Sequence, residues 1–138
     1  MITYKTTKDI LDKDLRLLYD SVGWYAYTNV IKDLKTLLNE CIIVYSAWED
    51  EKLVGLIRTV GDGISIQYVQ DILVLPEYQG KGIGKSLLTY VLDRSKTIRQ
   101  FVLITDSHEQ NKDALNFYKK CGLVTLENLN TIGFSRTM

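Results

Sequence analysis

The sequence is poor in the residues that mark secreted or metal-binding proteins. Its 138 residues include one proline, one histidine and two cysteines. Cys41 and Cys121 would allow a single disulfide, but two buried thiols also fit, and we expect a cytoplasmic protein because the first residues show no secretory segment. His108 lacks the spacing and the companion ligands of a zinc site, so we expect no metal.

Net charge and long apolar runs are missing as well. Lys plus Arg (17) equals Asp plus Glu (17), so no overall field attracts nucleic acid or an anionic membrane. No apolar run approaches the ~20 residues that a membrane span requires. Hydrophobic residues make up 46% of the chain, enough for one core. We therefore expect a single domain over residues 1–138 that binds neither nucleic acid nor membrane.

The spacing of apolar residues predicts alternating strands and helices. We expect strands over residues 2–6, 41–48, 53–60, 64–75 and 100–105, and helices over residues 11–22, 30–41, 83–92 and 110–120. Thr28 or Asn29 is expected to cap the second helix. The tail, residues 123–137, is predicted to add two short strands. The order β-α-α-β-β-β-α-β-α-β-β predicts an α/β (α+β) fold, a mixed sheet with helices on both faces.

A glycine-rich loop joins one predicted strand to the helix over 83–92. Gly80, Gly82 and Gly84 lie where backbone N–H groups and a helix dipole suit phosphate oxygens, although a tight turn without a ligand also fits. Two common glycine motifs are excluded by counting. A P-loop requires glycine where Gln79 stands, and a Rossmann fingerprint requires glycine where Lys85 stands.

The loop fits a third pattern. Gln79, Gly82 and Gly84 match Q/R-x-x-G-x-G/A, and the segment from residue 72 to residue 84 resembles the strand-loop-helix signature of the GCN5-related N-acetyltransferase (GNAT) family. About thirty residues later, the run from Asn111 to Leu123 resembles the second signature of that family, with Leu123 replacing the usual Phe. The order of elements is similar to the family's over essentially the whole chain.

The resemblance implies a GNAT-type fold and an enzyme that uses acetyl-CoA to acetylate a primary amine by direct attack on the thioester. It implies that the loop binds the CoA pyrophosphate and that the pantetheine arm pairs like an added strand with the preceding strand edge. The residues expected to contact CoA are Leu73, Val74, Leu75, Gln79, Gly80, Lys81, Gly82, Ile83, Gly84, Lys85, Asn111 and Tyr118. Asn111 fits a helix N-cap equally well.

Two catalytic roles follow from the same resemblance. The N–H of Val74 would polarise the thioester carbonyl, and Tyr118 would protonate the departing thiolate, although Tyr118 also fits a core position of its helix. The sequence identifies no general base. Family members often place Glu or His where Tyr68 or Gln70 stand. Strand alternation turns Asp71 to the opposite face unless a β-bulge re-aims it, so an amine of low pKa or proton loss through water is favoured.

An aromatic segment, residues 22–28, joins the first two predicted helices. In the family, this region lines the amine site. It forms a pocket or simply packs the helices together. The residues expected to contact the amine substrate are Trp24, Tyr27, Tyr68 and Gln70. We expect a small-molecule substrate such as an arylalkylamine or an amino acid. A non-catalytic acyl-CoA sensor, an enzyme that acetylates protein N-termini or lysines, and a homodimer all stay open.

Overall fold

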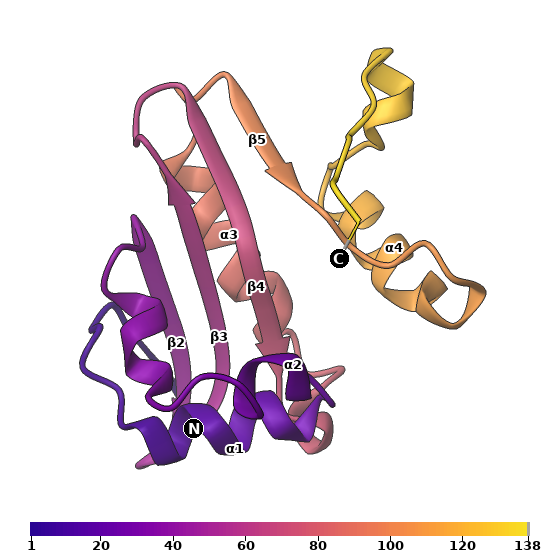
Figure 1. Cartoon of the computed structure of the whole chain (residues 1–138). Helices are drawn as coiled ribbons and strands as arrows, with labels where there is room; N and C mark the ends of the chain where they lie inside the picture. Colours follow the sequence, from indigo (N-terminus) through magenta and orange to yellow (C-terminus); the bar gives the residue numbers. More distant parts are fainter. Residues whose placement is uncertain (138) are drawn as a thin grey trace. The chain divides into compact units, whose positions relative to one another are not determined.

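The computed structural model describes residues 1–137. It consists of two compact units, Met1–Ile104 and a second unit that begins at Thr105, and each is described by itself. Figure 1 traces the chain and labels its main elements. Residues 1–137 contain no helix with the length and apolarity of a membrane span.

The first unit is built on a five-stranded sheet whose strands follow chain order. The strands are β1 (Ile2–Lys5), β2 (Ile43–Glu49), β3 (Lys52–Gly61), β4 (Ile66–Val74) and β5 (Gln100–Leu103). Neighbours among the first four pair antiparallel, and β4 pairs parallel with β5. The predicted mixed sheet is therefore confirmed, with strand ends within a few residues of the expected ones.

Helices cover both faces of this sheet, as predicted. Figure 1 shows α1 (Asp12–Ser21) and α3 (Ile83–Arg94) on opposite faces, and α1 packs on β3 and β4 while α3 packs on β2, β3 and β4. The apolar stripe of each helix is buried. Gly55 of β3 lets α3 approach closely, because a Cβ atom there would lie 3.1 Å from Ile83 Cγ2.

The predicted helix over residues 30–41 is wrong. The chain instead forms a short helix, α2 (Tyr25–Thr28), and a 3-10 helix, η1 (Leu34–Leu38). Thr28 is thus the last residue of a helix, and Asn29 is its C-cap rather than an N-cap. Arg16 donates to the carbonyls of Thr28, Ile31 and Lys32, which satisfies the end of α2 and holds the next residues out of a helix. Asp33 then caps η1 by accepting from the Lys35 N–H.

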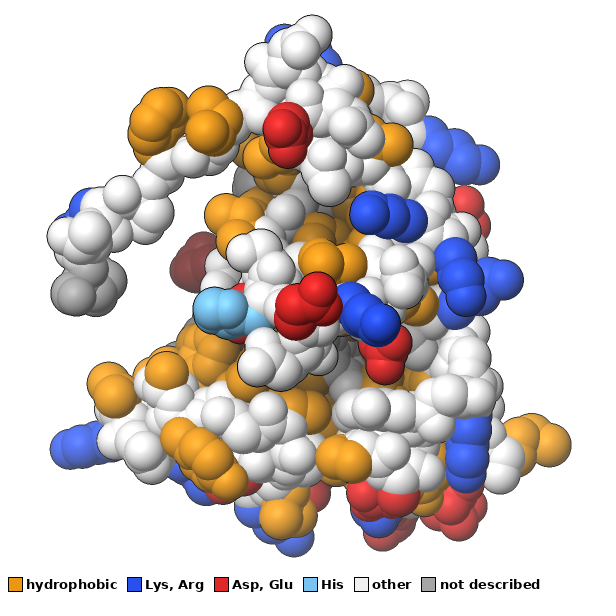
Figure 2. All heavy atoms as spheres, turned by 90° about the vertical axis from the view of Figure 1, so that its right-hand side faces the viewer, with side chains coloured by type: hydrophobic (Ala, Val, Ile, Leu, Met, Phe, Trp, Pro, Cys, Tyr) orange, Lys and Arg blue, Asp and Glu red, His pale blue; other side chains and the backbone are white. Residues whose placement is uncertain are grey.

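The second unit contains η3 (Glu109–Asn111), α4 (Lys112–Lys120) and η4 (Leu126–Leu129). The two strands predicted within residues 123–137 are not formed in this described tail. The turn of η4 ends at Asn130, whose φ is 55°, and the tail leaves Ile132 and Phe134 exposed. Figure 2 shows hydrophobic side chains, in orange, at the surface of the segment that ends in grey. Leu123 and Leu126 are half-buried, and Leu129 is exposed as well, so the tail presents no apolar face of the kind that a buried strand has.

Candidate functional site

The glycine-rich loop leads into the N-terminus of α3, where backbone N–H groups lack intrahelical partners. It runs from η2 (Pro76–Tyr78) into the first turn of α3. Gly80 and Gly82 have φ of 79° and 84°, a region in which a side chain is strained, and no heavy atom lies within 4 Å of a Cβ built on either. The Ser86 N–H donates to Gly82 O, so the N–H groups before it lie in the first turn without intrahelical partners.

The backbone of Val74 faces the edge of β4 away from β3. Leu75 N donates to Val54 O at 2.9 Å, which turns the backbone of Leu75 toward β3 and that of its neighbour Val74 the other way. Gln79 Nε2 donates to Val74 O at 3.0 Å and ties the loop to this edge. The fixed direction of the Val74 carbonyl therefore fixes the direction of the Val74 N–H as well.

The strand β5 leaves this edge open. It pairs with β4 only from Ile66 to Val69, and Figure 1 shows the two strands diverging beyond that point. In the described residues, no strand pairs with this side of β4 at the predicted segment from Leu73 to Leu75. The first unit therefore brings together an unpaired strand edge and the glycine-rich loop that follows it.

The middle of β4 carries a β-bulge. Arg58 pairs with Asp71 and the next residue, Thr59, pairs with Val69, so Gln70 is an extra residue without a partner on β3. One extra residue shifts the alternation, and Asp71 faces α1 and α2. The expectation from simple alternation, which turned Asp71 the other way, is corrected by this bulge.

Asp71 is fully engaged by its neighbours. It is 3% exposed, its Oδ2 accepts from the Tyr19 hydroxyl at 2.8 Å and from Arg58 Nε at 2.5 Å, and its Oδ1 accepts from the Tyr27 hydroxyl at 2.8 Å. Burial and then the charge of Asp71 raise the pKa of Tyr19. Three donors bind the carboxylate, so Asp71 is held on the face of α1 and α2 as the buried partner of Arg58.

The aromatic segment both packs the helices and lines a surface. The ring centroid of Tyr19 lies 6.0 Å from that of Trp24 and 5.0 Å from that of Tyr27. Tyr19 is buried, whereas Trp24 and Tyr27 are half-buried. Gln70 Nε2 donates to the Tyr27 hydroxyl at 3.1 Å. The first unit thus brings together three of the residues predicted to contact the amine, namely Trp24, Tyr27 and Gln70.

Tyr68, the fourth residue of that prediction, is half-buried on the same strand. Burial and then the charge of Asp71 raise the pKa of its phenol, so it keeps its proton at neutral pH. Neither Tyr68 nor the neutral amide of Gln70 is a general base. Sequence analysis missed two residues of this cluster, Tyr19 and Arg58. A basic residue within an apolar strand was the signal that could have identified Arg58.

Asn111 and Tyr118 belong to the second unit. Asn111 stands at the N-cap of α4 but makes no capping bond; its Nδ2 donates to Thr105 Oγ1 at 3.0 Å and to Asp106 O at 2.6 Å. Asn111 therefore orders the segment before α4. Tyr118 is half-buried, and burial followed by the neighbouring Cys121 raises the pKa of its phenol. The phenol keeps its proton at neutral pH, the form that a general acid requires.

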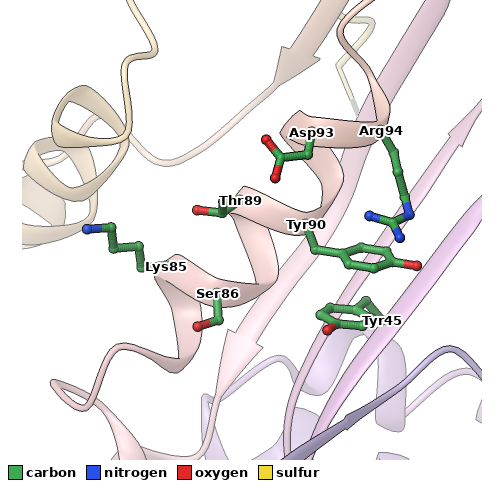
Figure 3. A pocket seen from close by; sticks show the side chains of 7 residues that line it. All are labelled: Tyr45, Lys85, Ser86, Thr89, Tyr90, Asp93 and Arg94. Carbon is green, nitrogen blue, oxygen red and sulfur yellow. The ribbon is translucent and has the colours of Figure 1, made fainter.

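A shallow hollow of about 370 Å³ lies along the outer side of α3. Figure 3 shows its lining, in which Tyr45 and Tyr90 stack with centroids 3.6 Å apart and Arg94 covers the Tyr90 ring at 3.5 Å. Tyr4 stacks on the other side of Tyr45. In Figure 3, Lys85 points away from these rings. The rings cover one another's faces, so we assign this stack a packing role.

Comparison with known proteins identifies the family. Residues 7–123 match the model of the Acetyltransferase (GNAT) family, and the chain belongs to this family. An uncharacterised N-acetyltransferase ycf52-like protein of Prochlorococcus marinus is 30% identical over 122 residues, which cover 84% of this chain and 63% of that protein. The chain therefore spans less than two thirds of the length of this relative.

Solved structures share the fold. A GNAT-family acetyltransferase of Streptococcus pneumoniae is 36% identical with a TM-score of 0.84, covering 100% of this chain and 98% of that one. The structure of AAC(6')-Iy in complex with a bisubstrate analog, CoA-S-monomethyl-acetylneamine, has a TM-score of 0.71 at 16% identity and covers 100% of this chain and 99% of that one. The predicted GNAT-type fold is confirmed.

Proposed function

We propose that the protein is an acetyl-CoA-dependent N-acetyltransferase that acetylates a primary amine of a small molecule, an arylalkylamine or an amino acid. The observation that carries the proposal is the open β4 edge at Val74 followed directly by the glycine-rich loop at the start of α3. The loop offers backbone N–H groups for the CoA pyrophosphate, and the unpaired β4 edge offers pairing for the extended pantetheine arm. A protein of the same fold binds a CoA-containing analog, which supports CoA as the ligand.

The residues of this chain fit acetyl-CoA, which supplies an activated thioester when bound. The N–H groups from Gly80 to Lys85 hold the pyrophosphate, and the exposed Lys81 and Lys85 add positive charge. The segment from Leu73 to Leu75 pairs with the pantetheine arm. The N–H of Val74 donates to the thioester carbonyl oxygen, where negative charge develops during attack by the amine.

Proton transfer is divided between Tyr118 and water. Tyr118 gives its proton to the departing thiolate, whose ordinary pKa of about 8.5 makes it a moderate leaving group. Asp71 is occupied by three donors, and neither Tyr68 nor Gln70 takes up a proton at neutral pH. The amine therefore loses its proton to water. An α-amine with a pKa of about 7.7–8 is already partly neutral near pH 8, whereas an alkylamine with a pKa nearer to about 10.4 reacts through a small neutral fraction, so its turnover should rise with pH.

The aromatic rings support a substrate with an apolar body. Trp24 and Tyr27 are half-buried neighbours, and Tyr27 lies beside Gln70, so the pair presents ring surface close to a polar group. An arylalkylamine or an amino acid with a large side chain matches this combination better than a polyamine, whose length is cationic throughout.

The test is a thiol-release assay of purified protein with acetyl-CoA. The panel comprises amino acids, arylalkylamines, polyamines, aminoglycosides and basic peptides, and CoA binding is measured in parallel by calorimetry. We expect CoA thiol release with arylalkylamines or amino acids. Turnover confined to basic peptides would instead indicate acetylation of protein N-termini or lysines. CoA binding without turnover would identify an acyl-CoA sensor.

A further inference from the structure

The orientation of the Gln70 side chain follows from the hydrogen bonds behind it. Asp71, a carboxylate paired with the Arg58 guanidinium, only accepts hydrogen bonds. The Tyr27 hydroxyl lies 2.8 Å from Asp71 Oδ1 and therefore donates its one proton to it. The oxygen of that hydroxyl is left with its two lone pairs, and it accepts from the groups on its other side.

Gln70 meets the accepting side of Tyr27. Its amide lies 3.1 Å from the Tyr27 oxygen, and only the amide nitrogen donates there, because the amide carbonyl would face a second acceptor. Arg58 Nη2, at 3.5 Å, takes the other lone pair. The direction of each proton is set by Asp71. The carbonyl oxygen of Gln70 consequently points away from Tyr27.

The carbonyl oxygen of Gln70 belongs to a residue that has no pairing partner on β3. Gln70 is the extra residue of the bulge, and its exposed side chain lies beside Tyr27, whose ring is half-buried and lies 6.3 Å from that of Trp24. An outward carbonyl oxygen next to apolar rings suits a ligand with a flat or apolar body and an N–H donor.

We infer that Gln70 determines specificity by accepting an N–H of the substrate amine on its carbonyl oxygen, and that Asp71 and Tyr27 are positioning residues that hold this oxygen outward. The inference rests on the proposed acetyl transfer and adds how the amine is recognised. The buried Arg58–Asp71 pair thus determines, through Tyr27, that Gln70 presents a hydrogen-bond acceptor to the amine.

The first test is a double-mutant cycle with 2-phenylethylamine as substrate at saturating acetyl-CoA. Gln70→Leu removes the oxygen, and we expect the KM for the amine to rise about tenfold, the loss of one good hydrogen bond. Tyr27→Phe keeps the ring but frees the amide to rotate, with an expected rise of about threefold. The double variant should match Gln70→Leu, because Tyr27 acts through Gln70.

The second test reverses the polarity of the chain of hydrogen bonds. In Asp71→Asn the new amide donates to Tyr27, Tyr27 donates to Gln70, and the Gln70 nitrogen turns outward. We expect the KM for the amine to rise about tenfold, as in Gln70→Leu, whereas the KM for acetyl-CoA stays within about twofold. A merely structural role for Asp71 would lower stability without this selective change in KM.

Gln100→Leu provides the control, because Gln100 is an exposed glutamine at the start of β5 and takes no part in these contacts. It should leave every constant unchanged. If Gln70→Leu leaves the KM for the amine unchanged, or if the effects of Gln70→Leu and Tyr27→Phe add, the inference is overturned while acetyl transfer stands. If the wild-type protein fails to acetylate 2-phenylethylamine, the proposed arylalkylamine substrate falls and the inference falls with it.

Discussion

Two neighbouring regions of the first unit differ in whether their polar groups have hydrogen-bond partners within the protein. Around Asp71 the carboxylate, the Arg58 guanidinium and two phenols are all paired with one another. In the loop to α3, the N–H groups of the first helical turn lack intrahelical partners, and Val74 lies at the part of the β4 edge that β5 does not cover. Only a few residues of β4 separate these regions.

The difference indicates that one part of β4 stabilises the fold and that another part binds a ligand. A saturated buried cluster holds elements in place, since any lost partner leaves a charge without compensation. An unsaturated backbone edge is available to a ligand that completes its hydrogen bonds. Changes in the first region should therefore affect stability, and changes in the second should affect ligand binding.

The largest effect is expected from breaking the saturated region. Asp71→Ala leaves Arg58 buried and unpaired, and we expect the free energy of unfolding to fall by about 3–5 kcal/mol, measured by urea denaturation. Asp93→Ala is the matched control, because the Asp93–Lys96 pair is exposed and should contribute less than about 1 kcal/mol. Equal losses in both variants would contradict the assigned role of the cluster.

A substitution of Tyr118 tests the proposed protonation of the departing thiolate, a step for which neither region supplies a residue. Tyr118→Phe removes the proposed proton donor, and kcat should fall about 100-fold while the KM for the amine stays unchanged. Because burial raises the pKa of Tyr118, its ionisation should not lower the wild-type kcat between pH 6 and pH 9. Tyr90→Phe is the control. Unchanged kcat in Tyr118→Phe across this pH range would remove the assignment.

A substitution in the unsaturated region should change binding more than stability. Gly82→Ala forces a side chain into φ of 84°, and we expect a loss of about 1–2 kcal/mol in stability together with a Kd for CoA about tenfold higher, measured by calorimetry. The strained loop no longer presents its N–H groups correctly. Gly133→Ala, at a glycine without positive φ, should change neither quantity.

The smallest effect concerns the exposed charges at the loop. Lys85→Ala should raise the KM for acetyl-CoA about threefold at low salt, because the side chain adds only a solvent-screened attraction. The difference from wild type should vanish at about 1 M salt, where the Debye length is about 3 Å. Lys96→Ala, also exposed on the first unit, serves as the comparison. A salt-independent effect would indicate a buried contact instead.

Much of this arrangement was predictable from local sequence. The glycine-rich loop was found because its positive φ angles require glycine, and the five strands of the sheet were found because apolar and aromatic residues recur along each of them. Asp71 was recognised as chemically suitable, but its direction depends on a bulge that arises only when Arg58 and Thr59 pair with residues of β4. Pairing between strands cannot be read from one strand alone.

The errors have the same origin. The apolar spacing of residues 30–41 predicts a helix, but Arg16, far away in the chain, satisfies carbonyls that a helix would use. Two short strands were predicted in the tail, yet pairing with another strand decides whether a strand forms. Tyr118 was predicted as an acid from its motif, and the raised pKa of its phenol agrees with that role, which remains a prediction.

The bulge at Gln70 also has a consequence for insertions and deletions. Arg58 and Thr59 are consecutive, and their partners Asp71 and Val69 are separated only by Gln70. Deleting this one codon would give an uninterrupted ladder with both partners still on their present faces. Gln70 can thus be lost without reversing the strand, so the sheet tolerates a deletion at the one position of β4 that we propose contacts the amine.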